Sequence, residues 1–498
     1  MSQNYRLENA GLINRQKKIS FKFNKKKYYG YEGDTLASAL IANGIHLVGR
    51  SFKYHRPRGF FGAGVDEPYA IVQLYRNNET DPNVRATEQE LFEGLEAESV
   101  NCWPNVNFDI GAINNFLRIF FPAGFYYKTF MWPRSFWYKI YEPIIRKAAG
   151  FGKASIKHDK ERYEHKYEYC DILVTGSGPS GLASAYAAAK NGAKVILAEE
   201  KPRFGGSLLT SDVNIGNQTG HEWAEKIISE LKTMPNVIVK NRSQVFGYYD
   251  HNMLVMSERV SDHLPKTDKY IPKQRLWYIR AKEVVISSGS IERPLVFGNN
   301  DTPGVMLSSA AKEYMKIYGV LVGKKPLIFT NNDSGYETAI EFKKNGIDPI
   351  ILDSRKNPKS DIITEAQNLN IKIKYSHVVV AAKGYKKVSS ADIAEISVDK
   401  KNLGKIENIS CDCICVSGFW TPTIHLASQS GSKTTFKKEI DAFVPSNSKQ
   451  NETTVGSANG IFSLNETINN AFENGHSLSN KITNKDNKVS IPTVVEKK

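Results

Sequence analysis

Three closely spaced glycines between a strand and a helix constrain the fold of this chain most strongly. Residues 176–181 read Gly-Ser-Gly-Pro-Ser-Gly; the apolar run 171–175 precedes them and the alanine-rich run 182–191 follows. A second apolar run, 193–198, ends at Glu199. Strand, glycine turn, helix and strand in this order predict a βαβ unit of a Rossmann-type α/β fold with parallel, buried strands.

Each glycine of this turn has a separate physical task. Gly176 permits the sharp turn, Gly178 leaves the backbone bare for a diphosphate, and Gly181 lets the helix approach the sheet. The N–H groups and the dipole at the helix start attract the negative diphosphate. Glu199, which comes 23 residues after Gly176, can bind ribose hydroxyls, and its charge disfavours a 2′-phosphate. The turn therefore predicts NAD or FAD rather than NADP; the alternative is a βαβ unit whose site is empty.

A second βαβ pattern, at 326–353, lacks the first two glycines of such a turn. Its residues 331–335 read Asn-Asn-Asp-Ser-Gly, so side chains stand where bare backbone would contact a pyrophosphate. We predict a retained fold with a lost or altered nucleotide site in this second unit.

Two other segments are typical of proteins with two dinucleotide-binding domains. Residues 204–207 contain a second glycine turn, and residues 455–464 place small side chains ahead of a helix. Together these patterns predict a two-dinucleotide-binding Rossmann fold, like that of pyridine nucleotide-disulfide reductases, over residues 168–483. Its second nucleotide unit would occupy roughly 290–410.

The regions outside this fold have different patterns. Alternating apolar residues, a helix at 34–44 and a further strand indicate a small β-grasp domain over residues 1–100. Residues 101–167 contain too many large rings, Phe125-Tyr-Tyr among them, for a solvated linker. We expect this segment to pack on its own domain or on a partner subunit. Residues 484–498 have the composition of an unfolded tail.

Composition excludes several classes of protein. The 498 residues carry 67 Lys and Arg against 52 Asp and Glu, a net charge of +15, but the basic residues are scattered. We therefore expect no nucleic-acid partner. Five cysteines without a Cys-x-x-Cys pair argue against a metal site and against a thiol–disulfide reductase. The alternating cysteines of 411–415 instead indicate one buried face of a strand.

No catalytic group or membrane segment stands out. The ten histidines have no evident nucleophile partner, so we assign no catalytic residue to this chain. The most apolar window, 110–132, is interrupted by Asn, Arg and Lys and lacks the roughly 18 uninterrupted apolar residues of a spanning helix. The chain start has no apolar stretch typical of a secretion signal. We expect a cytoplasmic protein without a membrane partner.

Several longer stretches resemble the alpha subunit of heterotetrameric sarcosine oxidases. The longest reads Val48-Gly-Arg-Ser-Phe-Lys-Tyr-His-Arg-Pro-Arg-Gly59, and the others are 33–40, 123–133, 141–150 and 289–297. The resemblance spans nearly the whole chain. It implies a β-grasp domain like a ferredoxin without its cluster, followed by a two-dinucleotide fold that holds NAD.

The resemblance also implies a flavoenzyme complex around this chain. In that family the beta subunit holds FAD, where sarcosine (N-methylglycine) is oxidatively demethylated to glycine. FMN lies between alpha and beta and reduces O2 to H2O2, and gamma and delta subunits complete the complex. Carried over by motif position, the NAD contacts here would be Gly176, Gly178, Ser180, Gly181, Glu199, Glu200, Lys201, Ser207, Val245, Ala458 and Leu464.

Two features of this sequence depart from relatives within that superfamily. Relatives that oxidise other imino acids keep ferredoxin-type cysteines after an Arg-Gly pair, whereas the residues after Arg58-Gly59 include none up to Ala70. A [2Fe–2S] cluster needs four ligands, usually thiolates, so we expect this domain to be cluster-free. The family's alpha subunit also continues into a folate-binding, aminomethyltransferase-like domain; we expect that half to be either a separate polypeptide or lost here.

Three alternatives remain open at this point. The chain could be an independent flavoprotein oxidoreductase, with FAD in the first nucleotide site and NADH near 326–353. It could be the alpha subunit of a related imino-acid or opine dehydrogenase. It could also be a structural scaffold that binds neither nucleotide.

Overall fold

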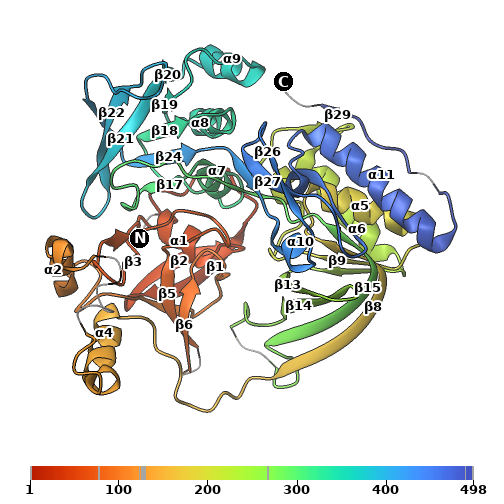
Figure 1. The fold of residues 1–498 in the computed structure, drawn as a ribbon, viewed down its shortest axis with the longest axis horizontal. Coiled ribbons are helices and arrows are strands. Elements are labelled where there is room, and N and C mark those ends of the chain that lie inside the picture. Colours follow the sequence, from red (N-terminus) through yellow and green to blue (C-terminus); the bar gives the residue numbers. More distant parts are fainter. Residues whose placement is uncertain are drawn as a thin grey trace. The chain divides into compact units, whose positions relative to one another are not determined.

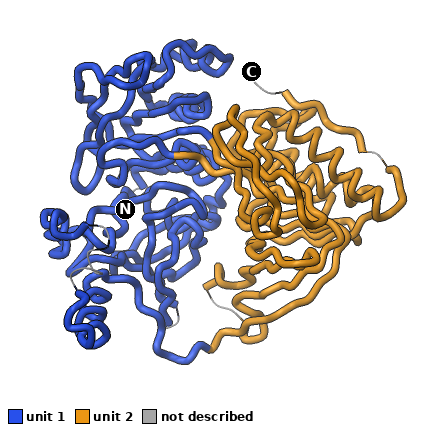
Figure 2. Tube along the Cα trace, viewed as in Figure 1, with its two compact units in different colours: residues 1–159, 294–419 blue, residues 160–293, 420–498 orange. Residues whose placement is uncertain are grey.

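A computed structural model describes most of the chain: residues 3–76, 79–122, 124, 130–265, 268–487 and 489–495. The chain forms two compact units, each built from two separate stretches of sequence (Figure 2). Unit 1 contains residues 1–159 and 294–419, and unit 2 contains residues 160–293 and 420–498. The N-terminal domain therefore shares a unit with the second βαβ pattern, and the first βαβ pattern lies in unit 2.

Unit 1 begins with a five-stranded sheet in the order β2-β1-β7-β5-β6 (Figure 1). Its strands are β1 Asn14–Phe23, β2 Lys26–Glu32, β5 Ile71–Arg76, β6 Glu79–Arg85 and β7 Glu96–Ser99. Alternation along β1 buries Ile19, Phe21 and Phe23, as a strand with one core face requires. These side chains belong to the core of this domain, and every residue of helix α1, Leu36–Ala42, is buried as well.

The sequence predicted a helix at 34–44, and the structure has helix α1 at Leu36–Ala42 with Thr35 as its N-cap. The Thr35 hydroxyl, not the Asp34 carboxylate, accepts the Ser38 N–H, and the Ser38 side chain accepts the Thr35 N–H in return. Asp34 is instead fully buried and forms a two-point ion pair with Arg6, at 2.7 and 3.0 Å. The Arg6 guanidinium also donates to the Tyr318 carbonyl, so this ion pair joins residues far apart in the sequence.

The second part of unit 1 is a parallel sheet in the order β17-β24-β18-β19-β20. Its strands are β17 Val305–Leu307, β18 Pro326–Thr330, β19 Ile350–Asp353, β20 Lys372–Tyr375 and β24 Cys413–Ser417. Helices α7 Ser308–Lys316, α8 Ser334–Lys344 and α9 Asp361–Asn368 connect them. Strands β18 and β24 are buried throughout. The prediction that the alternating cysteines lie on a buried strand is confirmed for Cys413 and Cys415, and Cys411 is buried just before it.

Smaller elements complete unit 1. Strands β21 His377–Gly384, β22 Val388–Glu395 and β23 Glu407–Ser410 form an antiparallel sheet, and β3 Gly49–Arg50 pairs with β4 Pro57–Arg58. At β4, Arg56, just before the strand, and Arg58, within it, both bind the carboxylate of Asp301. Burial alone would raise the pKa of Asp301, but the two guanidinium groups hold it below its ordinary value.

The aromatic segment lies within unit 1 up to residue 159. It forms α2 Ile113–Phe116, a π-helical turn at Trp137–Tyr141 and α4 Glu142–Ala149. His55 is buried against this segment: Nδ1 lies 2.7 Å from Asp109 Oδ2 and Nε2 lies 3.1 Å from the Ala148 carbonyl.

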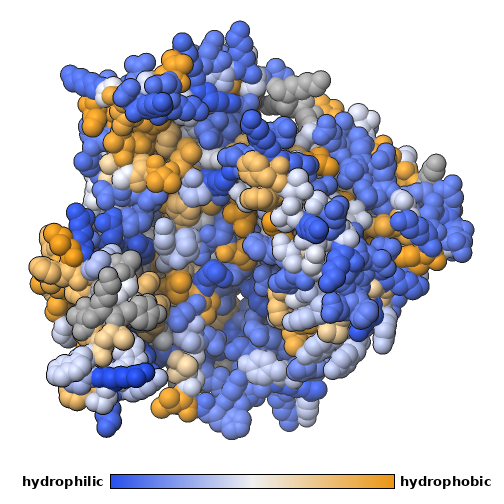
Figure 3. Space-filling model, in the orientation of Figure 1, coloured by the Kyte–Doolittle hydropathy of each residue, from blue (hydrophilic) through white to orange (hydrophobic). Residues whose placement is uncertain are grey.

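Many rings of this segment do not pack on the chain. Trp103, Phe116 and Trp132 expose 68%, 82% and 83% of their surface, and apolar side chains gather at the edge of unit 1 around α2 (Figure 3). Phe125-Tyr-Tyr lies outside the described residues. We expected this segment to pack either on its own domain or on a partner subunit. For these three rings, packing on the chain's own domain is wrong.

Unit 2 is built on a sheet in the order β12-β9-β8-β15-β14-β13, with β28 added beside β15. Its strands are β8 Tyr163–Thr175, β9 Val195–Ala198, β12 Val237–Lys240, β13 Ser243–Tyr249, β14 Met253–Arg259, β15 Gln274–Ile286 and β28 Glu452–Thr454. Parallel pairing of β12, β9, β8, β15 and β28 confirms the predicted parallel arrangement around the first βαβ unit.

Three helices pack near the glycine turn at 176–181: α5 Pro179–Lys190, α6 Gly220–Thr233 and α11 Leu464–Thr483. Helix α11 lies along α5 (Figure 1). The Ser184 hydroxyl of α5 donates to the Ala471 carbonyl of α11. A Cβ on Gly475 would lie 2.3 Å from the Ser184 carbonyl oxygen, so the two helices approach too closely for a larger residue.

Short elements occupy the remainder of unit 2. They are β10 Asn214–Ile215, β11 Gln218–Thr219, β16 Ser290–Glu292, β25 Trp420–Pro422, α10 His425–Gln429, β26 Thr434–Lys437, β27 Ala442–Pro445 and β29 Val494–Val495. Strand β29 pairs with β10, so the expectation of an unfolded tail is wrong for these two residues. The polar composition of the tail concealed a valine pair that an open strand edge can accept.

Candidate functional site

The turn between β8 and α5 is closed to side chains at its first and third glycines. Gly176 has φ +104°, and a Cβ there would lie 2.5 Å from the Ser287 carbonyl oxygen. A Cβ on Gly181 would lie 1.9 Å from the Gly176 carbonyl oxygen. The Ser287 hydroxyl fixes the turn by donating to the carbonyls of Thr175 and Gly176. The chain's own backbone therefore requires glycine at 176 and 181.

The second glycine of the turn has a different environment. A Cβ on Gly178 would meet no atom of the described residues within 4 Å, apart from its chain neighbours. Gly178 is the N-cap of α5, and Pro179 follows as the first helical residue. The N–H groups of Ser180 and Gly181 belong to the first helical turn, which has no acceptors within the helix. The space beside Gly178 thus fits an anion bound to bare backbone and to a helix N-terminus.

The second glycine turn lies directly against the first. The Gly205 N–H donates to the Ser177 carbonyl over 3.1 Å, and a Cβ on Gly206 would lie 2.8 Å from Gly178 Cα. Gly205 and Gly206 both have positive φ, +119° and +54°, which glycine adopts without strain. Ser207 follows, exposed, in a short 3-10 helix at Gly206–Leu209. Ser207 is therefore brought to the same turn as Gly178.

Glu199 points into the turn rather than away from it. Its Oε2 accepts the Ser177 N–H at 2.9 Å and the Ser177 hydroxyl at 2.6 Å, and its Oε1 accepts the Lys201 N–H at 2.9 Å. A carboxylate oxygen has two lone pairs, so Oε1 can accept one further bond, for example from a ribose hydroxyl. Glu199 is 7% exposed, and its carboxylate uses most of its hydrogen-bonding capacity within the turn. The sequence did not reveal this use of Ser177.

Val245 lies on the strand that starts next to this acid. The Ser243 N–H donates to the Glu199 carbonyl over 2.7 Å, and Val245, two residues further along β13, pairs with Met256 of β14. The Gln244 amide lies 3.5 Å from the Glu200 carboxylate. Residues 199–201 and the start of β13 are therefore adjacent.

The segment before α11 reaches the first turn of α5. A Cβ on Gly456 would lie 2.6 Å from Ser180 Oγ, so the short helix Gly456–Asn459 packs directly on Ser180. Ala458 in this helix is fully buried, and Leu464 is the partly buried first residue of α11. Of these two, Ala458 has no exposed surface for a ligand.

The corresponding turn of the second βαβ unit is filled by its own side chains. Asn332, 7% exposed, donates to the carbonyl and hydroxyl of Ser417 and accepts the Ser334 N–H. At the end of β19, the buried carboxylate of Asp353 accepts bonds from the Tyr336 hydroxyl and from Arg355. This arrangement agrees with the expectation that the second site is lost or altered.

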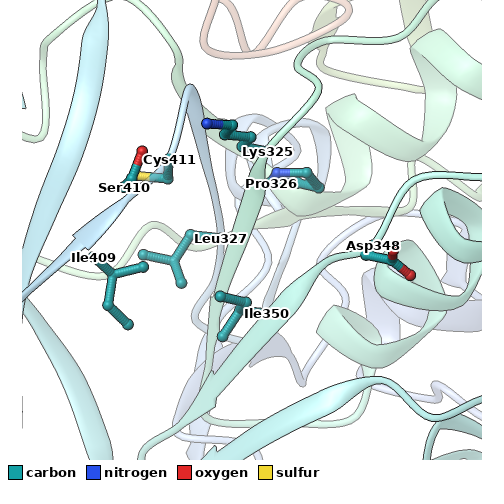
Figure 4. Close-up of a pocket in the computed structure, with 8 residues that line it drawn as sticks. All are labelled: Lys325, Pro326, Leu327, Asp348, Ile350, Ile409, Ser410 and Cys411. Atoms are coloured by element: carbon teal, nitrogen blue, oxygen red, sulfur yellow. The ribbon is translucent and has the colours of Figure 1, made fainter.

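A cavity of about 220 Å³ in unit 1 lies at the opposite end of these strands (Figure 4). It is lined by Lys325, Pro326, Leu327, Asp348, Ile350, Ile409, Ser410 and Cys411. Pro326 and Ile350 are the first residues of β18 and β19. Nucleotides bind α/β sheets at the carboxyl ends of the strands, so this cavity does not correspond to a nucleotide site.

Metal and membrane features can be assessed for the described part of the chain. There, no three His, Cys, Asp or Glu side chains come together in a group that could bind a metal ion. Within the same residues, no helix is long and apolar enough to span a bilayer.

Two known protein families match parts of this chain. The family described as FAD dependent oxidoreductase matches residues 171–245, and the family described as 2Fe-2S iron-sulfur cluster binding domain matches residues 16–102. Sarcosine oxidase subunit alpha of Rhizobium meliloti (strain 1021) is 46% identical over 441 residues, 88% of this chain and 44% of the relative. The chain is homologous to the N-terminal portion of sarcosine oxidase alpha subunits.

Other comparisons agree with this homology. Sarcosine oxidase subunit alpha of Corynebacterium sp. (strain P-1) is 31% identical over 472 residues, 93% of this chain and 44% of the relative. This alpha-subunit homologue thus spans less than half the length of these curated relatives. The crystal structure of L-proline dehydrogenase from P. horikoshii has a TM-score of 0.64 at 19% identity and covers 97% of this chain and 75% of that chain. That likeness shows a shared fold.

The matched iron–sulfur domain cannot bind its cluster in the usual way in this alpha-subunit homologue. Residues 16–102 contain one cysteine, Cys102, and burial raises the pKa of its thiol to about 11. A [2Fe–2S] cluster needs four ligands, mostly thiolates. The residues present do not fit the cluster that the family description names.

Proposed function

We propose that this chain is the NAD-binding alpha subunit of a sarcosine oxidase complex. The complex would demethylate sarcosine oxidatively to glycine and reduce O2 to H2O2. Homology to sarcosine oxidase alpha subunits supports the assignment to such a complex. The observation that carries NAD binding is the vacant position beside Gly178, between two glycine turns and the start of α5.

The roles of this chain's residues follow from that position. The first-turn N–H groups of α5 bind the diphosphate, because they have no acceptors in the helix. Oε1 of Glu199 accepts a ribose hydroxyl, and Ser177 holds that carboxylate in place. Ser207 is exposed and directly follows Gly206, which lies against Gly178, so its hydroxyl could donate to a phosphate oxygen. FAD on the beta subunit and FMN at its interface with this chain would supply the redox chemistry, so no catalytic acid or base is needed here.

The exposed aromatic segment supports partner binding. Contiguous apolar surface of this kind marks protein–protein contacts in soluble proteins. Trp103, Phe116 and Trp132 would be covered by the beta subunit, while the gamma and delta subunits bind elsewhere. Large rings with high exposure are costly in a monomer and typical of the centre of an interface.

The test is to isolate the chain with its associated subunits and to identify nucleotides and polypeptides by mass spectrometry. We expect NAD, FAD and FMN together with a flavoprotein partner, and H2O2 production that depends on sarcosine. Neither the isolated chain nor the partner without this chain should sustain that rate. Sarcosine oxidation by the isolated chain, or an isolated complex without NAD, would contradict the proposal.

A second function is favoured by one observation, the match of residues 171–245 to FAD dependent oxidoreductases. FAD and NAD share the adenosine diphosphate that the Gly178 site would bind, so FAD could occupy it in an independent flavoprotein. Such an enzyme needs a separate site for NADH, and Asn332 fills the second turn. If the isolated chain is yellow and NADH bleaches its colour, this second function is favoured. If the complex instead prefers opines over sarcosine, the chain is the alpha subunit of an opine-oxidising enzyme.

A further inference from the structure

Glu67 is the buried carboxylate around which the loop after Arg58 is organised. The loop runs from Gly59 to Ala70, between β4 and β5 of unit 1. Glu67 is 1% exposed. Its Oε1 accepts the N–H groups of Tyr69 and Ala70 at 2.6 and 2.9 Å. Its Oε2 accepts those of Phe61 and Gly62 at 2.6 and 2.8 Å.

These four contacts fit an ionised carboxylate. Each oxygen has two lone pairs, and each already accepts two N–H groups, so a proton on either oxygen would displace a donor. Burial raises the pKa of Glu67 above its ordinary value, and the four backbone N–H groups, which favour the charged form, offset only part of this effect. The loop therefore encloses a negative group that belongs to the chain itself.

The domain around this loop matches the iron–sulfur domain family, yet the loop contains no cysteine. Iron–sulfur clusters accept hydrogen bonds at their sulfur atoms, which stabilise the charge of the cluster. We propose that the Glu67 carboxylate takes the place of the cluster as the anion around which residues 61–70 fold. The loop would keep the inward N–H groups of a cluster site and satisfy them with a side chain.

The same loop connects two parts of unit 1. Phe61 and Gly62 donate their N–H groups to Glu67, while their carbonyls accept the Leu307 N–H at 2.8 Å and the Tyr314 hydroxyl at 3.0 Å. Glu67 is thus a positioning residue for the contact between the N-terminal domain and the residues around α7. Glu67 has this role whichever amine the complex oxidises.

The experiment replaces Glu67 and returns a carboxylate from solution. Glu67→Ala leaves four inward N–H groups around a cavity, and we expect the midpoint of thermal unfolding of the full-length chain to fall by about 5–10 °C. Sodium formate should recover at least half of that loss, whereas formamide and sodium chloride at equal concentration should not. The control is Asp66→Ala, because Asp66 in the same loop accepts one N–H, from Gly64. Its midpoint should stay close to that of the wild type and should not respond specifically to formate.

Glu67→Gln provides a second variant if Glu67→Ala does not fold. The amide keeps the size of the side chain but turns an NH2 group toward N–H donors, so the midpoint should fall and formate should not restore it. An unchanged midpoint in either Glu67 variant, or equal effects of formate and formamide on Glu67→Ala, would overturn the proposal. Anaerobic incubation of the wild type with iron and sulfide should give no cluster absorption, and the appearance of a bound cluster would overturn it as well.

Discussion

A methyl group at Gly178 would separate nucleotide binding from folding in this chain. Gly178 has φ −65° and ψ −176°, which alanine adopts freely, and the position of its Cβ is vacant among the described residues. Alanine is a poorer N-cap than glycine but lowers the entropy of the unfolded chain, and these effects oppose each other. We therefore expect Gly178→Ala to keep the free energy of unfolding within about 1 kcal/mol of the wild type.

Nucleotide binding should respond strongly to the same change. The methyl group occupies the place where a diphosphate contacts backbone, and it removes at least one hydrogen bond to a charged group, which is worth about 1.5–3 kcal/mol. The Kd for NAD should rise by about 10- to 150-fold, measured by isothermal titration calorimetry.

Gly181→Ala is the matched contrast. Its Cβ would lie 1.9 Å from the Gly176 carbonyl oxygen, so this variant should lose about 1–3 kcal/mol of stability or more through overpacking. Both variants are compared by thermal unfolding without nucleotide. Wild-type affinity for NAD in Gly178→Ala would refute the assignment of the diphosphate to this position. A large loss of stability in that variant would refute the claim that the position is vacant.

Three further predictions concern the rest of the chain. Arg6→Ala should lower the free energy of unfolding by about 3–5 kcal/mol in urea titrations, because it leaves Asp34 buried and without its ion pair; a loss below about 1 kcal/mol would contradict this. The pKa of Asp301 is lower in the folded than in the unfolded chain, so its ion pairs stabilise the chain above the unfolded pKa, and this stability is lost as the pH falls through the folded pKa. Asp301→Asn should therefore be less stable than the wild type at neutral pH and less sensitive to acid, and equal acid sensitivity of the two proteins would count against the ion pairs. Phe116→Ser and Trp132→Ser should leave the melting temperature unchanged but weaken co-purification of partner subunits, and undiminished recovery of the partners would show that these rings do not lie in the interface.

The glycine turn could be predicted because local geometry determines it. The spacing at 176–181 specifies a tight turn, a bare backbone and a close helix contact, and the structure has each of these features. The parallel strands around the turn were also predictable, since long apolar runs leave few alternatives. The missing glycines at 331–335 also predicted that side chains occupy the second turn, as Asn332 does.

Contacts between distant residues could not be predicted. Ser287, which fixes the turn through Gly176, comes more than 100 residues later, and no local pattern marks it. The role of Glu67 was hidden in the same way, because the sequence showed missing cysteines but not which group satisfies the loop. The tail was misjudged since its composition carries no information about the free edge of β10. The exposed rings could be recognised as excess apolar surface, but the sequence does not show what covers them.

The most direct test of the central claim is an experimental structure of the purified complex with its nucleotides retained. We expect NAD with its diphosphate against Gly178, within hydrogen-bond distance of the N–H groups that begin α5, and a ribose hydroxyl on Oε1 of Glu199. A dinucleotide bound elsewhere on this chain, or a protein side chain in the space beside Gly178, would contradict the account.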